Sequence, residues 1–236
     1  MVVGGSNPLF RSIHGAGLVP APLVIGSQTP RERLRVPLLR HRRGPGEEVL
    51  ISPRSPGSDP AEVERAVAGL IRSLGLDPKS EPELELTPGR VAELFTEIFS
   101  GLDPANEPEL AVFPHPDRGD DLVIVRDLEF HSLCVHHFVP FFGRAHVAYL
   151  PGEHIVGISG PARLVDFYAR RPQLQERLTN QIADHLERIV RPRGIAVMLE
   201  ARHLCMEMRG VRKSGNIETR VRRGALAEPR WAGLLP

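Results

Sequence analysis

The sequence predicts an α+β domain in which helices lie on one face of a largely antiparallel sheet. Apolar residues recur at helical spacing over residues 58–102 and again over 161–190, whereas residues 122–159 and 194–211 alternate between apolar and polar side chains. A chain of 236 residues is long enough for one sizeable domain or two small ones, and its 41% hydrophobic and 25% charged residues are typical of a globular protein. We therefore expect an ordered domain over residues 58–236.

Residues 1–57 precede this domain and differ from it in composition. They are rich in Gly, Pro, Ser and Arg and show no sustained hydrophobic period, so we interpret them as a disordered N-terminal extension. An organellar transit peptide is the alternative interpretation, because the stretch is rich in arginine and poor in acidic residues.

The domain is predicted to begin with a pair of helices over residues 58–102. In SDPAEVERAVAGLIRSLGL, Ser58 or Asp59 can cap a helix that has Pro60 at its first position. Thr87 is the corresponding cap of TPGRVAELFTEIFSGL. Each helix carries an apolar stripe, which suits packing of one helix against the other. The stripe of the first helix comprises Val63, Val67, Leu70, Ile71 and Leu74.

Residues 120–236 are predicted to contain the sheet and a second helical block. The segments DLVIVRDLEF, GRAHVAYLPG, HIVGIS and GIAVMLEARHLCMEMRGV have strand character. Between them, PARLVDFYARR is a predicted helix that runs to Pro172, which can open the next helix, QLQERLTNQIADHLERIV. The apolar stripe of that helix comprises Leu174, Leu178, Ile182 and Leu186.

The charge balance and the hydropathy argue against two classes of partner. A formal net charge of +1 provides no overall field to attract nucleic acid or a membrane surface. No apolar run approaches the roughly 20 residues that a membrane-spanning helix needs, and the first residues lack the apolar segment of a secretory signal. We therefore expect a cytoplasmic protein without nucleic-acid or membrane partners.

The stretch HSLCVHHFVP combines a cysteine with three histidines. Zinc in a catalytic site takes three protein ligands and leaves a fourth position for water, whereas a structural site has four protein ligands. Cys134, His137 and Cys205 supply three ligands. The candidates for a fourth are His131, His136 and His203. Residues three apart on a strand point to opposite faces, so a Cys-x-x-His chelate requires a turn or bulge here.

The predicted last strand adds a second chemical group. His203 and Cys205 would share one face of that strand, which would place a free imidazole beside the metal for proton transfer. Two alternatives stay open. The two cysteines, which are the whole thiol inventory, could form one disulfide, or both could be small buried residues with unrelated histidines nearby.

Four segments in sequence order, CVHHFVPFFGRAHVAYLPG, IVGIS, RPQLQERLTNQIA and EARHLCMEMRGV, resemble the GTP cyclohydrolase I family. The similarity extends from about Glu62 to about Val211. It implies the tunnelling fold, in which the subunits of a homodecamer build a β-barrel and the active sites lie between subunits. It also implies Zn²⁺-dependent opening of the imidazole ring of GTP, release of C8 as formate and formation of 7,8-dihydroneopterin triphosphate, on the route to pterins and tetrahydrofolate.

The resemblance implies roles for the matching metal and proton-transfer residues. Zinc would be held by Cys134, His137 and Cys205, and proton transfer would fall to His136 and His203.

It also implies substrate contacts. Glu176, which would act with the catalytic residues, and Gln175 before it would hold the guanine edge. Ser159, Arg163 and Arg209 would meet the phosphates, and arginine suits bidentate phosphate contacts.

The sequence departs from the family pattern at two positions near these sites. Val135 stands where the family usually has Glu, and Gly160 stands where a lysine usually follows the serine of the phosphate loop. Basic residues near the C-terminus could replace that lysine or could form a solvated charge run. They are Arg212, Lys213, Arg220, Arg222 and Arg223.

These departures define two alternatives to GTP cyclohydrolase I activity. A divergent paralogue would open a guanine nucleotide and stop at a formamidopyrimidine or diaminopyrimidine, or would use a differently phosphorylated purine. A non-catalytic module would hold zinc for structure only.

Overall fold

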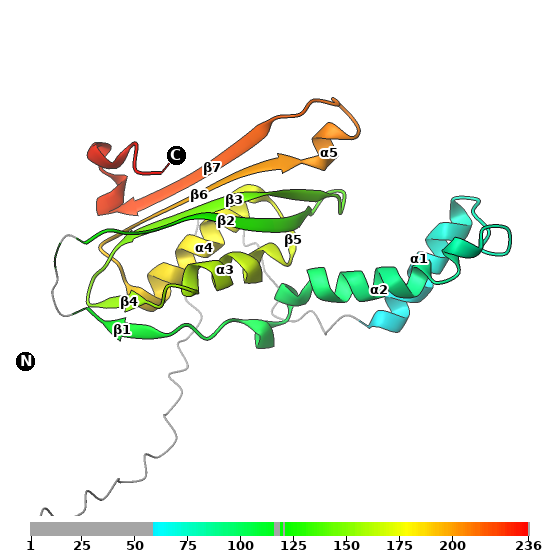
Figure 1. Ribbon diagram of the computed structural model, residues 1–236, viewed down its shortest axis with the longest axis horizontal. Helices are drawn as coiled ribbons and strands as arrows, with labels where there is room; N and C mark the ends of the chain where they lie inside the picture. The colour runs from blue at the N-terminus through cyan, green and yellow to red at the C-terminus, as the bar shows by residue number, and fades with distance from the viewer. Residues whose placement is uncertain (1–58, 116–118, 120, 236) are drawn as a thin grey trace, which may run out of the picture. The chain divides into compact units, whose positions relative to one another are not determined.

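The computed structural model describes residues 59–115, 119 and 121–235 of the chain. The predicted extension over residues 1–57 lies outside the described residues. The described part begins with two helices and continues into a sheet covered by two further helices, which confirms the predicted α+β class (Figure 1). Among these residues, none of the helices combines the length and the apolar character needed to cross a bilayer.

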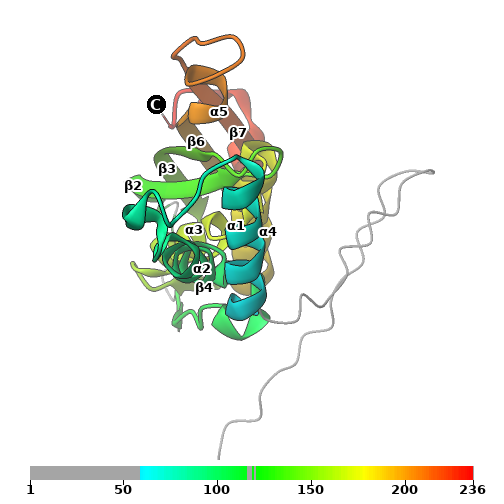
Figure 2. The same ribbon diagram turned by 90° about the vertical axis from the view of Figure 1, so that its right-hand side faces the viewer.

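Helices α1 (Pro60–Ser73) and α2 (Thr87–Ile98) form the predicted pair and pack against each other (Figure 2). Asp59 caps α1, because its carboxylate accepts hydrogen bonds from the backbone N–H groups of Ala61 and Glu62 at 3.0 and 3.4 Å. Of the two predicted caps, Asp59 is confirmed, as is Pro60 at the first helical position, whereas Ser58 lies outside the described residues.

The predicted cap of α2 and the predicted stripe of α1 need correction. Thr87 is the first residue of α2 and not its cap, since Leu86 before it already has helical dihedral angles. On α1, Ile71 is buried, but Leu70 and Leu74 are 57% and 66% exposed. The partner helix α2 covers only part of the stripe.

The main sheet has five strands in the order β5-β2-β3-β6-β7. They are β2 (Val123–Cys134), β3 (Pro140–Leu150), β5 (Pro172–Gln173), β6 (Gly194–His203) and β7 (Asn216–Gly224). All neighbours are antiparallel except β5, which runs parallel to the end of β2. A separate two-stranded sheet pairs β1 (Val112–Pro114) with β4 (His154–Val156).

Helices α3 (Gly160–Ala169) and α4 (Gln175–Val190) cover one face of the main sheet (Figure 1). Leu178, Ile182 and Leu186 of α4 are completely buried in the core between helices and sheet, as their spacing predicted. This core holds the first turn of α4 in a defined place against β6 and β7.

The beginning of α4 differs from the prediction. Pro172 does not open the helix, because it pairs with the free edge at the end of β2 and so belongs to β5. The backbone N–H of Val135 donates to the carbonyl of Gln173 at 2.9 Å and extends this pairing. Leu174 is therefore an extended residue before the helix, 37% exposed, and not part of the buried stripe.

The last described residues cover part of the opposite face of the sheet. Successive strand residues point to opposite faces, and Ala148, Ala196 and Met198 form a second apolar cluster with Leu226 and Leu235 of the tail. The tail contains only short 3-10 turns, over Ala225–Ala227 and Pro229–Trp231.

Candidate metal centre and active site

The chain reverses direction directly after β2. The backbone N–H groups of His137 and Phe138 donate to the carbonyl of Cys134 at 3.3 and 2.8 Å, and the N–H of Cys134 donates to the carbonyl of Val139 at 3.0 Å. These bonds close a tight turn. A Cys-x-x-His chelate needs such a turn, because residues three apart on a strand point to opposite faces. As a result Nδ1 of His137 lies 3.9 Å from Sγ of Cys134.

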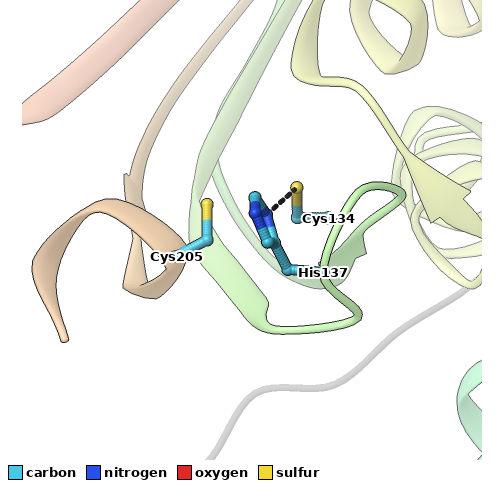
Figure 3. Close-up of side chains that lie close together, drawn as sticks. All are labelled: Cys134, His137 and Cys205. Carbon is cyan, nitrogen blue, oxygen red and sulfur yellow. Dashed lines mark hydrogen bonds between the residues drawn. The ribbon is translucent and has the colours of Figure 1, made fainter. Parts of the chain in front are cut away.

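The second cysteine reaches the same place from another element. Strand β6 ends at His203, and Leu204–Glu207 form a short helix, α5. The expectation that His203 and Cys205 share one strand face is therefore wrong, because the chain leaves the extended conformation between them. The helical turn directs Cys205 toward Cys134 and His137 (Figure 3).

The geometry and the donor chemistry of these three residues fit a zinc ion. The ligand atoms of Cys134, His137 and Cys205 all lie within 4.8 Å of one another. Zinc–sulfur and zinc–nitrogen bonds of ordinary length place tetrahedral ligand atoms about 3.5–3.8 Å apart, so the three atoms need only a small inward shift to bind the ion. Two thiolates and an imidazole suit zinc, and within the described residues the group has three members, which leaves one coordination position.

The electrostatics of the site also favour a cation. Burial raises the pKa of the Cys205 thiol, and the neighbouring Cys134 raises it further. Two thiolates side by side repel each other, and a bound divalent cation relieves that repulsion. A disulfide, the alternative that the sequence left open, is not formed, since both cysteines are free.

The other histidines of the motif stand outside this group. His136 is exposed, although its Nδ1 lies 3.8 Å from Sγ of Cys134, and its ring meets that of His137 edge-on at 6.1 Å. His131 stacks on Phe142 with ring centroids 5.7 Å apart. Neither residue completes a fourth ligand position.

His203 is held from two sides. Its ring stacks on that of Phe141, with centroids 4.6 Å apart and planes 8° from parallel, and its Nε2 lies 2.8 Å from Oε1 of Gln175. Burial lowers the pKa of His203, while the carboxylates of Glu176 and Glu207 act in the opposite direction. Sequence reasoning missed the supporting role of Phe141, which depends on the cross-strand pairing of Phe141 with His203.

Gln175 is buried, with 2% of its surface exposed, and its amide nitrogen is within hydrogen-bonding distance of three protein acceptors. It donates to the carbonyls of Leu199 and Ile217 at 3.0 and 2.8 Å and approaches Oγ1 of Thr219 at 3.2 Å. The structure therefore places this side chain between α4, β6 and β7. Glu176, next in sequence, is exposed on the first turn of α4.

The residues expected to meet phosphates lie on two separate segments. Ser159 and Arg163 are exposed at the start of α3, and the N–H of Arg163 donates to the carbonyl of Ser159 at 3.1 Å. Arg209 is exposed in the segment after α5, close enough to Cys205 to lower the pKa of its thiol. Gly160 is buried, and a Cβ at this position would lie 2.5 Å from Cγ2 of Val156.

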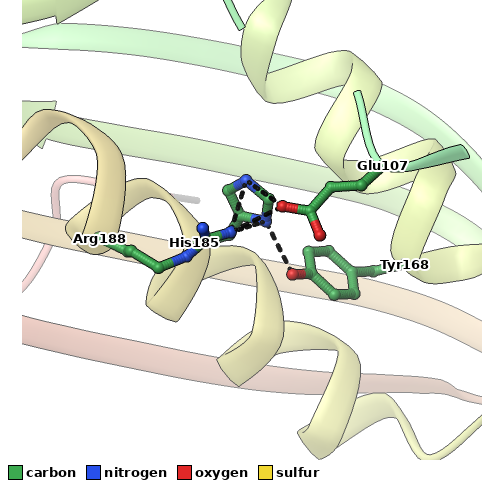
Figure 4. A network of polar contacts seen from close by, with 4 residues as sticks. All are labelled: Glu107, Tyr168, His185 and Arg188. Carbon is green, nitrogen blue, oxygen red and sulfur yellow. Dashed lines mark hydrogen bonds and ion pairs between the residues drawn. The ribbon is translucent and has the colours of Figure 1, made fainter. Parts of the chain in front are cut away.

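A second polar cluster joins the linker after the helical pair to the helix layer (Figure 4). The imidazole of His185 is completely buried, and its Nδ1 lies 2.8 Å from the hydroxyl of Tyr168. Arg188 approaches both ring nitrogens at 3.2 Å, and Oε1 of Glu107 lies 3.6 Å from Nε2. Burial lowers the pKa of His185 to about 4, helped by the charge of Arg188 and opposed by Glu107.

Comparison with known proteins agrees with the geometry. Residues 63–231 match the family model described as GTP cyclohydrolase I. GTP cyclohydrolase 1 of Brucella anthropi is 52% identical over 157 residues, which cover 66% of this chain and 73% of the relative. The Streptococcus thermophilus protein of the same name is 49% identical over 172 residues, covering 72% and 90%. That of Brucella canis is 49% identical over 164 residues, covering 69% and 76%.

Proposed function

The chain belongs to the GTP cyclohydrolase I family and is an enzyme of that type, and from this premise we propose a zinc-dependent opening of the guanine imidazole ring of GTP. The reaction would release C8 as formate and close the remaining atoms to 7,8-dihydroneopterin triphosphate, with a net uptake of one water. The observation that carries the proposal is the convergence of Cys134, His137 and Cys205 within 4.8 Å.

Zinc is the cofactor that these residues would hold. When bound, it supplies the Lewis acidity that makes water a nucleophile at neutral pH. The three-membered ligand set supports a catalytic rather than a purely structural role, because a structural site takes four protein ligands. The non-catalytic alternative is therefore the weaker one.

His203 would exchange protons with the purine. Its Nε2 faces the carboxamide oxygen of Gln175, so the neutral ring carries its proton on Nε2 and leaves Nδ1 to accept a proton, which the resulting imidazolium can then donate. His136, exposed beside Cys134, is the second candidate for proton transfer. Glu176 is exposed on the first turn of α4, where its carboxylate is free to accept hydrogen bonds from the guanine N1–H and amino group.

Ser159, Arg163 and Arg209 would bind the triphosphate. Within the described residues, no carboxylate pairs with either arginine, so both guanidinium groups are available to an anion. We infer that the complete site forms between subunits of a homo-oligomer, a homodecamer in the family pattern. We place the enzyme in the cytoplasm, on the route to pterins and tetrahydrofolate.

One observation favours a second candidate function. Gly160 stands where the family usually has a lysine, and the buried position has no free space for a side chain next to Val156. A site that binds the triphosphate less tightly would accept a differently phosphorylated guanine nucleotide. Alternatively, it would release a formamidopyrimidine or diaminopyrimidine before the new ring of the pterin closes.

Mass spectrometry of the products distinguishes these functions. The zinc-loaded chain is incubated with GTP and, in parallel, with other guanine nucleotides, and formate, 7,8-dihydroneopterin triphosphate and ring-opened pyrimidines are quantified separately, with Cys205→Ala as the matched control. Formate and the pterin in equal amounts, both lost in the control, would support the proposed reaction. Accumulation of a ring-opened nucleotide would support the second candidate, and absence of any product from guanine nucleotides would refute both.

A further inference from the structure

Phe138, the residue directly after His137, has an unusual backbone conformation. Its φ angle is +51°, in the left-handed region that glycine and asparagine adopt readily and bulky residues rarely adopt. The conformation lets the N–H of Phe138 donate to the carbonyl of Cys134 at 2.8 Å and so closes the turn that carries His137. A phenyl group at such a position implies that the ring has a use of its own.

The ring of Phe138 packs against the end of the helical pair. It meets Phe99 edge-on, with centroids 5.5 Å apart, and Phe95 in the same manner at 6.4 Å. Phe95 and Phe99 stack on each other at 5.5 Å, so the three rings form one cluster, which we call the phenylalanine clamp. The clamp joins α2 to the turn, although Phe138 itself is 50% exposed.

The side chain of His137 needs this support. Its ring is exposed, and within the described part of the chain its contacts are the edge-on one with His136 and the approach of Nδ1 to Sγ of Cys134 at 3.9 Å. The turn is also anchored by the buried side chain of Cys134 at its start and by backbone hydrogen bonds at Cys134 and Val135. Aromatic packing of Phe138, immediately after the ligand, therefore adds a side-chain anchor at the far end of the turn from Cys134.

We propose that Phe138 is a positioning residue for the metal ligand His137, and that α2 holds the metal turn in place through the phenylalanine clamp. The inference rests on the proposed zinc site. Residues that orient a metal ligand from outside the coordination sphere typically change metal affinity by about 10- to 100-fold when removed. The helical pair then has a role in the metal site as well as in packing.

The test is zinc affinity of the full chain, measured on metal-free protein by competition with a chromophoric chelator. Phe138→Asn keeps a residue that tolerates the left-handed conformation but removes the ring, and Phe138→Gly removes both the ring and any backbone strain. We expect the zinc affinity of both variants to fall by roughly 10-fold or more relative to the unaltered chain. Phe99→Ala should lose less affinity, and Phe138→Trp, which keeps an aromatic ring, should bind zinc nearly as tightly as the unaltered chain. Phe113→Ala removes another half-exposed ring, on β1, and should leave the affinity unchanged.

A spectroscopic readout separates positioning from general destabilisation. Co²⁺ in place of zinc should show an altered ligand-field spectrum in Phe138→Asn, while the thermal unfolding midpoint of the metal-free variant stays near that of the unaltered chain. If Cys205→Ala abolishes zinc binding but Phe138→Asn and Phe138→Gly leave affinity and spectrum unchanged, the zinc site stands and the role of Phe138 is refuted. If the unaltered chain binds no zinc, the proposed function and the inference both fail.

Discussion

Oε1 of Gln175 accepts a hydrogen bond from Nε2 of His203 over 2.8 Å. The orientation of the carboxamide follows from its other contacts, because the carbonyls of Leu199 and Ile217 can only accept hydrogen bonds and therefore face the NH₂ group. Gln175 thus selects the tautomer of His203 and holds its ring. The family resemblance assigned this residue to the guanine edge, and the two roles make different kinetic predictions.

Gln175→Leu should lower kcat for GTP by roughly 100-fold with a smaller change in KM. A mispositioned proton donor stabilises the transition state less, whereas binding of the ground-state substrate changes little. Steady-state kinetics and zinc content measure the effect. A raised KM with kcat retained would instead identify Gln175 as a guanine contact. Asn180→Ala, on the same helix and partly exposed, is the matched control for a lost carboxamide.

His203→Ala should retain zinc and lose turnover by roughly 100-fold or more, since the imidazole lies outside the ligand group. Metal analysis and product formation are measured on the same preparation. Cys205→Ala, two residues further on, should lose metal and activity together. Unchanged turnover in His203→Ala would remove this residue from the mechanism, and full zinc content in Cys205→Ala would remove the proposed coordination.

The spacing of apolar residues and the capping residues predicted the features of the fold that neighbouring residues determine. The stripe Leu178, Ile182 and Leu186 identified the buried face of α4, and Pro60 with Asp59 marked the start of α1. The turn after Cys134 could also be predicted, because a strand cannot bring residues three apart to one metal.

The remaining features depend on contacts between distant segments. Pro172 joins β2 as a strand because a free edge happens to lie beside it. Cys205 reaches Cys134 and His137 from a helical turn, in a segment whose alternation favoured a strand. The contacts of Gln175 need β6 and β7 in place, so composition and spacing could not separate a buried support from a substrate contact.

The buried His185 makes stability depend on pH. Its pKa is about 4 in the folded protein and 6.5 ordinarily, because burial and the charges of Arg188 and Arg171 disfavour the imidazolium while Glu107 compensates only in part. The unfolded chain therefore binds the proton more readily, and stability is lost as pH falls from about 6.5 toward 4. Chemical denaturation should show a loss of roughly 2 kcal/mol from this group between pH 7.5 and 5.

His185→Phe should reduce this pH dependence by the share of His185, while burial of His146 and His203, which also lowers their pKa, maintains the rest. Stability at pH 7.5 should fall, since the hydroxyl of Tyr168 loses its partner. His154→Gln, an exposed histidine of β4, is the control and should keep the full pH dependence of the unaltered chain. An equal slope in His185→Phe would contradict the assignment of the proton uptake to His185.

Gly160→Lys tests the proposal that phosphate binding is altered at Gly160, but this substitution changes charge and bulk together. The new Cβ would lie 2.5 Å from Cγ2 of Val156, so a second substitution, Val156→Ala, is needed to make room. In the Val156→Ala background, Gly160→Lys should tighten GTP binding by roughly 10- to 100-fold, the strength of a hydrogen bond to a charged group. Gly160→Gln in the same background supplies similar bulk without charge, so any gain specific to lysine is electrostatic. Calorimetric titration with GTP and with guanosine locates the effect: a gain for GTP alone would place Gly160 at the phosphates, and an equal change for guanosine would place it elsewhere.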